Sequence, residues 1–95
     1  MLFEWDDKKN ATNLKKHGIE FEVAISIFKG LVLTKTDSRV DYAEVREISL
    51  GEIGNQIVIV IVHTDRKNVT RVISARPASK TERKKYYAYC KKIIE

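Results

Sequence analysis

The stretch IVIVIV, from Ile57 to Val62, is an unbroken run of β-branched apolar residues. Such residues favour strands, and a strand without polar alternation must be covered on both of its faces. We therefore expect this run to form the central strand of a β-sheet. It is far shorter than the roughly 20 residues of a membrane-spanning helix, so we expect no membrane association.

Turn-forming residues bound this strand on both sides. The segment from Gly51 to Asn55 holds two glycines and an asparagine, and it predicts a hairpin turn after an alternating strand over Arg46 to Leu50. A second turn, expected over Asp65 to Asn68, leads into a strand over Val69 to Arg76. Pro77 cannot donate to a sheet ladder, so it closes that strand.

Two further strands are expected nearer the N-terminus. Apolar residues from Leu2 to Trp5 indicate a short first strand, and Leu31 and Leu33 indicate another. The polar segment from Thr36 to Tyr42 is expected to be a loop.

Two helices are expected between these strands. Asp6 is a suitable N-cap for a helix over Asp7 to Lys16, and Gly18 supplies a left-handed stop. The segment from Phe21 to Phe28 carries apolar residues at positions i, i+3, i+4 and i+7, which predicts a helix with one buried face. Gly30 ends it.

A last helix is expected over Lys80 to Ile94. Ser79 and Glu82 have the spacing of a capping box at its start. We expect it to bury four side chains, namely Tyr86, Tyr89, Cys90 and Ile93. The elements together predict an α+β fold. Its mostly antiparallel sheet of four to five strands is packed by N-terminal helices and a C-terminal helix, all in a single domain, 1–95.

The charge distribution favours a polyanion or an acidic protein as partner. The net charge is +5, and ten basic residues lie between Arg66 and Lys92 against one acidic residue, Glu82. A solubilising charged face is the alternative interpretation. The single cysteine, Cys90, cannot form an internal disulfide, and no spacing of Cys and His resembles a zinc site. We expect a cytoplasmic protein with neither metal nor cofactor.

Basic residues and a histidine follow the central strand. His63 stands where polarity begins, Arg66 lies in the expected turn, and Arg71 and Arg76 lie on the returning strand. Arginine binds phosphate oxygens in a fork, and histidine can transfer protons near neutral pH. Regular alternation puts Arg71 and Arg76 on opposite faces of the sheet, unless a bulge intervenes.

Proton-transfer roles remain open at this stage. His63 is equally well interpreted as a structural histidine, and a two-histidine site would require His17 to approach it. His17 has a structural alternative at the end of its helix, where a cation complements the dipole. Glu82 is either a general base or a capping-box member.

The motifs together resemble those of the BrnT toxin family. They run in the family's order along most of the chain, as Phe3-Glu4-Trp5-Asp6, Asn13 to Ala24, His63-Thr64-x-Arg66, Arg71 to Ala78, and Glu82-Arg83-x-x-Tyr86. The resemblance implies a small ribonuclease of the RelE-like group, which halts translation by cutting RNA. It also implies a neutralising antitoxin, BrnA, a ribbon-helix-helix protein that alone would contact the operator DNA.

The resemblance also suggests site residues. The expected catalytic set is His63, Arg66, Arg71, Arg76 and Glu82. The expected RNA-binding set is Lys15, Lys16, His17, Arg46, Arg83, Lys84 and Tyr87, and no metal ligand is expected. Two alternatives are a basic RNA- or DNA-binding module without catalysis, and a protein that only receives its antitoxin.

Overall fold

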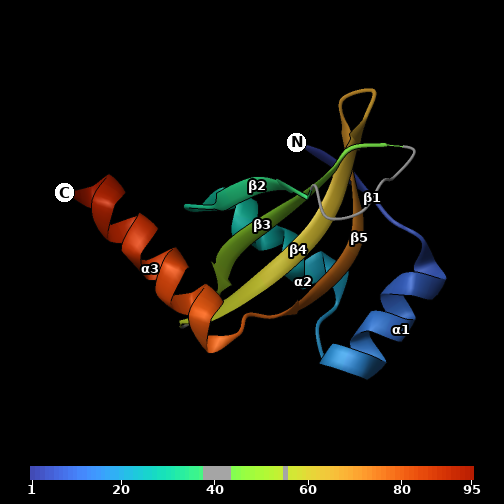
Figure 1. Ribbon diagram of the computed structural model, residues 1–95. Helices are drawn as coiled ribbons and strands as arrows, with labels where there is room; N and C mark the ends of the chain where they lie inside the picture. The colour runs from blue at the N-terminus through green and yellow to red at the C-terminus, as the bar shows by residue number, and fades with distance from the viewer. Residues whose placement is uncertain (38–43, 55) are drawn as a thin grey trace.

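A five-stranded mixed sheet forms the centre of the computed structural model, which describes residues 1–37, 44–54 and 56–95 (Figure 1). The strands are β1 (Leu2–Glu4), β2 (Leu33–Asp37), β3 (Arg46–Ile53), β4 (Ile57–Arg66) and β5 (Val69–Pro77). Their order across the sheet is β1-β5-β4-β3-β2. Among the strand pairs of the described residues, only β1 with β5 is parallel. The mostly antiparallel sheet and the central place of β4 are thus confirmed.

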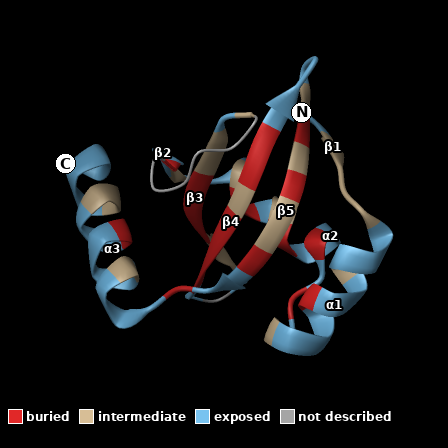
Figure 2. Cartoon of the chain, turned by 45° about the vertical axis from the view of Figure 1, so that its right-hand side comes forward, coloured by how far each residue is buried: buried red, intermediate tan, exposed pale blue. Residues whose placement is uncertain are grey.

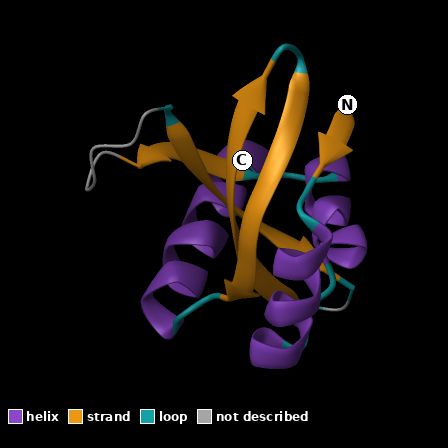
Figure 3. Cartoon of the chain, turned by 90° about the vertical axis from the view of Figure 1, so that its right-hand side faces the viewer, coloured by secondary structure: helices purple, strands orange, loops and turns teal. Residues whose placement is uncertain are grey.

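Helices cover both faces of this sheet. They are α1 (Asp7–His17), α2 (Phe21–Ala24), the 3-10 helix η1 (Ile25–Lys29) and α3 (Lys80–Ile94). Figure 3 shows the strands between α3 on one side and the N-terminal helices on the other. Among the described residues, no helix is both long and apolar enough to cross a membrane.

The sheet separates two apolar clusters. Ile59 and Ile61 of β4 pack with Phe21 and Ile27 on the face toward α2 and η1. The alternate residues of β4, Val58 and Val60, pack with Tyr86 on the face toward α3. The buried residues of β4 therefore serve both clusters, as the unbroken apolar run predicts (Figure 2).

Several boundaries differ from the sequence-based expectation. β4 continues to Arg66, and the turn shrinks to Lys67 and Asn68, both with positive φ, as a tight two-residue hairpin requires. β2 extends through Asp37 and takes the first residues of the expected loop, whose remainder, 38–42, lies outside the described residues. β3 likewise continues to Ile53, and Asn55 of the expected turn lies outside the described residues too.

The helices are mostly as expected. Asp6 caps α1 by accepting from two backbone N–H groups, and Gly18 is left-handed with φ of 73°. The helix expected from Phe21 to Phe28 is instead one α-helical turn followed by η1. Ile93 of α3 is more than half exposed, so its predicted burial is wrong. Tyr89 and Cys90 are half-buried.

Candidate functional site

A bulge in β5 brings two separated arginines to one face of the sheet. Val62 pairs with Ser74, whereas His63 pairs with Val72. The residue between them on β5, Ile73, therefore has no partner on β4. Arg76 lies opposite Val60, and Arg71 lies opposite Thr64. Because Val60 and Thr64 are an even number of residues apart, both arginines lie on the face toward α3.

Arg46 of β3 belongs to the same face. Its neighbour two residues on, Ile48, packs in the cluster on the α3 side, and alternation gives Arg46 the same orientation. Across β2 and β3, Arg46 pairs in register with Asp37. The face toward α3 thus carries arginines from two strands.

Each arginine of the predicted catalytic set contacts a carboxylate. Arg76 donates from two nitrogens to Glu82, at 2.8 and 2.9 Å, and Arg66 donates likewise to Glu44, at 2.9 and 2.7 Å. Arg71 lies 2.6 Å from an oxygen of Glu4.

The same guanidinium groups can bind an anion in exchange for a carboxylate. Carboxylate and phosphate present similar pairs of oxygens, so the guanidinium groups are already oriented for a phosphate. The arginine side chains are 28 to 49% exposed. A phosphate would bind by exchange with these carboxylates, in competition with the two-point contacts at Arg66 and Arg76.

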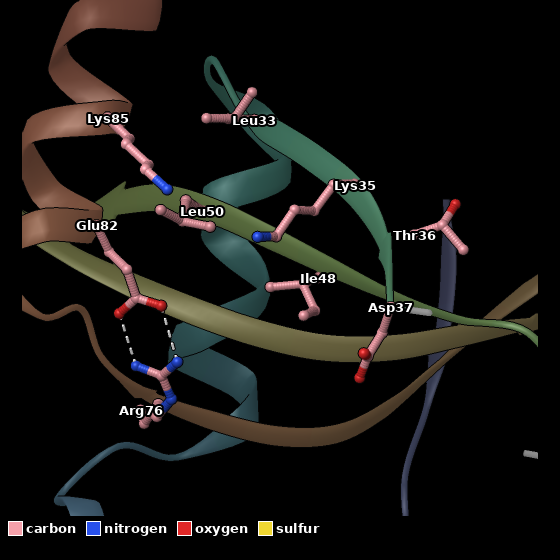
Figure 4. A pocket seen from close by; sticks show the side chains of 9 residues that line it. All are labelled: Leu33, Lys35, Thr36, Asp37, Ile48, Leu50, Arg76, Glu82 and Lys85. Carbon is pink, nitrogen blue, oxygen red and sulfur yellow. Dashed lines mark hydrogen bonds and ion pairs between the residues drawn. The ribbon is translucent and has the colours of Figure 1, made fainter. Parts of the chain in front are cut away.

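A groove with a volume of about 490 Å³ lies beside Arg76, between α3 and strands β2 and β3 (Figure 4). Leu33, Ile48 and Leu50 form its apolar floor. In Figure 4, Lys35 extends from β2 and Lys85 from α3 over this floor. The groove therefore combines an apolar floor, which suits a base, with three cations, which suit phosphates, and two carboxylates, Asp37 and Glu82.

Two lysines and an aspartate of this groove were not anticipated from the sequence. Lys35 and Asp37 alternate with Leu33 on β2, a signal that was hidden because Thr36 and Asp37 were assigned to a loop. Lys85 follows Glu82 by three residues and so shares its side of α3.

Glu82 performs the capping role that its spacing predicts. It accepts from the backbone N–H of Ser79 at 2.8 Å, and the Ser79 hydroxyl accepts from the Glu82 N–H. The hydrogen bonds from Arg76, then those from Ser79, lower the pKa of Glu82 to about 2. A carboxylate with that pKa is a poor proton acceptor at neutral pH. The two hydrogen bonds that Glu82 accepts from Arg76 instead fit a role in orienting the Arg76 guanidinium group.

His63 lies on the opposite face of the sheet, so the single surface expected for it and the arginines is not formed. It pairs with Glu47 and Val72, and its ring is buried edge-on against Phe28, with the centroids 5.3 Å apart. Nε2 lies 2.7 Å from the Ser49 hydroxyl. Burial lowers the pKa of His63, so the neutral ring is favoured.

His17 does not meet His63 in the described structure. It is half-buried at the end of α1 and lines a groove with Ile73 and Ser74, whereas His63 contacts Ser49 and Phe28. The two-histidine arrangement is therefore not formed. Among the described residues, no cluster of three His, Cys, Asp or Glu residues could hold a metal ion.

The remaining predicted RNA-binding residues are at the surface. Lys15, Lys16 and Lys84 are exposed, and Arg83 donates to the carbonyl oxygen of Ala78 at 3.1 Å. Tyr87 is exposed, as expected, with its hydroxyl 3.5 Å from Glu52.

Comparison with known proteins identifies the family of the chain. The family described as ribonuclease toxin, BrnT, of type II toxin–antitoxin systems matches residues 5–82. A crystal structure of the Brucella abortus ribonuclease toxin, BrnT, is similar to the chain, with a TM-score of 0.63 and 28% sequence identity. The similarity covers 84% of this chain and 100% of that one. No curated protein matches. Because the family matches most of the sequence, the chain belongs to the BrnT family of ribonuclease toxins.

Proposed function

We propose that the chain is a metal-independent endoribonuclease whose active site is the sheet face toward α3, centred on Arg71, Arg76 and the adjoining groove. The β5 bulge supports this proposal most directly, because the two arginines share a face only through it. The groove beside Arg76 supports it further, since its apolar floor and lysine rim suit one nucleotide.

The proposed reaction is an internal phosphoryl transfer. The 2′-oxygen of the RNA attacks the adjacent phosphorus as its proton passes to a solvent water, and the bond to the 5′-oxygen breaks as that oxygen takes a proton from water. The products are a 2′,3′-cyclic phosphate and a 5′-hydroxyl. Negative charge builds up on the phosphoryl oxygens in the transition state, where fixed cations stabilise it most.

Individual residues then have distinct roles. Arg71 and Arg76 stabilise the phosphoryl oxygens, and Glu82 orients Arg76 through its two-point contact. Lys35 and Lys85 hold the phosphates on either side.

Other predicted residues extend this surface. Arg46 adds charge to the same face, while Arg66, Arg83, Lys84 and Tyr87 contact RNA beyond the reacting nucleotides. This assignment does not require His63, whose place in the opposite core favours a structural role.

The direct test is cleavage of a defined RNA by purified protein in EDTA, with Arg76→Ala as the site variant and Lys29→Ala as the control. Losing one positioned cation should lower kcat by about 10²- to 10³-fold, and the control should retain parental activity. An Arg76→Ala protein that is folded and fully active would overturn the site assignment. Cleavage that requires added Mg²⁺ would overturn metal independence.

We further propose that this cleavage inhibits translation in the cytoplasm and that a cognate antitoxin, a BrnA-like ribbon-helix-helix protein, neutralises it. Membership of a type II toxin family supports an antitoxin partner. Induced expression should arrest growth, co-expression of the antitoxin should relieve the arrest, and Arg76→Ala should not cause it. Operator DNA should bind the complex but not the toxin alone.

A further inference from the structure

A second groove lies between α1 and β5, and it shares no lining residue with the groove beside Arg76. Its volume is about 310 Å³. Four basic side chains of α1 line it, namely Lys8, Lys9, Lys16 and His17. They occupy positions i, i+1, i+8 and i+9, which lie on one side of a helix. The groove is therefore a basic surface with a fixed shape.

Asn13 fixes the helix that presents this surface. β1 pairs only with Val69–Arg71, so the edge of β5 beyond that point has no strand partner in the described structure. Asn13 replaces that partner. Its side-chain amide donates to the Ala75 carbonyl at 2.7 Å and accepts from the Ala75 N–H at 3.1 Å. It also donates to the carbonyl of Ile19 at 3.0 Å.

The charge environment of this groove differs from that of the sheet face toward α3, which carries Arg71 and Arg76 and which we call the arginine face. There, Arg66, Arg71 and Arg76 each contact a carboxylate. No described residue that lines the α1 groove is acidic, and Lys8, Lys9 and Lys16 are exposed. Several cations around one concavity focus a positive field on it, and a phosphate backbone is the ligand class that meets such a field along its length.

The groove also adjoins the proposed active site. Ser74, which lines it, pairs with Val62 and lies on β5 between Arg71 and Arg76. Since Val62 packs in the cluster on the α3 side, Ser74 faces the same side as the two arginines. A strand of RNA that crosses the arginine face can therefore continue over the edge of β5 onto α1.

We propose that the α1 groove is a second binding site for the sugar–phosphate backbone of the RNA substrate, outside the reacting nucleotides. The proposal rests on the proposed ribonuclease function, because it assigns the direction in which the substrate leaves the arginine face. It also gives Lys16 and His17 a role distinct from catalysis.

The test compares Lys9→Glu/Lys16→Glu with a control of equal charge change, Lys29→Glu/Lys92→Glu. Lys29 and Lys92 are exposed and lie outside both grooves, and Lys92 matches Lys16 in its place at a helix end. Thermal unfolding establishes that both variants are folded. Binding of a non-cleavable 20-nucleotide 2′-O-methyl RNA is then measured between 50 and 300 mM KCl. A trinucleotide and a 20-nucleotide RNA serve as substrates for cleavage.

The groove variant should bind the long RNA about tenfold more weakly at low salt. The slope of log K against log [KCl] should fall by about 1.4, since each contact to a single-stranded phosphate contributes roughly 0.7. Its KM for the long RNA should rise in proportion, while cleavage of the trinucleotide is unchanged.

Three outcomes would overturn the proposal. If both double variants lose the same affinity, the effect is one of net charge. If trinucleotide cleavage falls as well, the groove belongs to the active site. If binding of the long RNA is unchanged, the groove does not bind RNA, and an acidic protein becomes the alternative ligand. A parent protein that binds RNA but cleaves none would refute the proposed function, whereas the binding comparison would still test the groove.

Discussion

At the scale of single residues, Glu82 has two roles that substitutions can separate: it caps the start of α3 and it binds Arg76. Glu82→Gln keeps an acceptor for the Ser79 N–H, because glutamine also completes a capping box. It removes the charge that holds Arg76. We therefore expect kcat to fall about tenfold and Tm at pH 7 to fall modestly, because the contribution of the Arg76 contact is lost while the cap is kept. Glu82→Ala also loses the cap, so it should lower kcat and should lower Tm further than Glu82→Gln does. A Glu82→Gln protein with parental kcat would contradict the positioning role.

The same substitution should change the acid stability. The pKa of Glu82 is lowered from its ordinary value near 4.5 to about 2, chiefly by Arg76. A lowered pKa stabilises the folded state above the ordinary value, and this contribution disappears as pH falls from about 4.5 to 2. Urea unfolding at pH 7, 4 and 3 should therefore show a shallower loss of stability for Glu82→Gln than for the parent.

His63 gives a prediction at higher pH. Burial lowers its pKa below 6.5, outweighing the opposing effects of Glu47 and Asp65. The neutral ring is thus part of the folded state, and stability should be complete above pH 6.5 and decrease as pH falls below it. His63→Phe retains the ring packing against Phe28 but cannot be protonated. Its urea midpoint should therefore change less between pH 7 and pH 5 than that of the parent.

Activity distinguishes the two interpretations of His63 that the sequence leaves open. If the histidine is structural, folded His63→Phe should cleave RNA at close to the parental kcat. A loss of 10²-fold or more in a folded variant would restore a catalytic role. The sequence could not settle this point, because the face on which a strand residue lies depends on register, and register is a property of the assembled sheet.

At the scale of elements, the sequence predicts regular structure well and irregular structure poorly. The apolar run of β4, the Asp6 cap and the Ser79–Glu82 capping box depend on neighbouring residues, and all are confirmed. The β5 bulge depends on how two strands pair, so alternation alone put Arg71 and Arg76 on opposite faces. The main geometric feature of the candidate site was therefore the least predictable.

The packing of η1 on β3 supplies a test of the core. A Cβ added at Gly51 would lie 2.6 Å from the Cβ of Ile27, so η1 or β3 would have to move. Gly51→Ala should destabilise the fold by about 1–3 kcal/mol, the usual cost of overpacking. Gly30→Ala is the matched control, since its added Cβ would meet nothing closer than 3.9 Å. Equal urea midpoints for the two variants would contradict this close packing.

At the scale of the whole molecule, the charge distribution predicts a class of binding partner but not the place where that partner binds. The excess of basic residues after Arg66 predicts a polyanion or an acidic protein as partner, and this stays a prediction. It gave no indication of Lys35, because β2 lies far away in sequence and reaches the groove only through the sheet order. Contacts between distant segments are where an analysis from sequence patterns alone is weakest.

The last prediction concerns the salt dependence of the whole protein. If the arginine face and the groove beside it bind RNA through phosphates, kcat/KM should fall linearly with KCl concentration on logarithmic axes. The slope should be about −0.7 for each phosphate contacted, hence near −2 to −3 for three or four contacts. The kcat should change little, because bound phosphates have already displaced their counterions. Potassium glutamate in place of KCl controls for anion effects, and a flat kcat/KM would show that binding does not depend on phosphate charge.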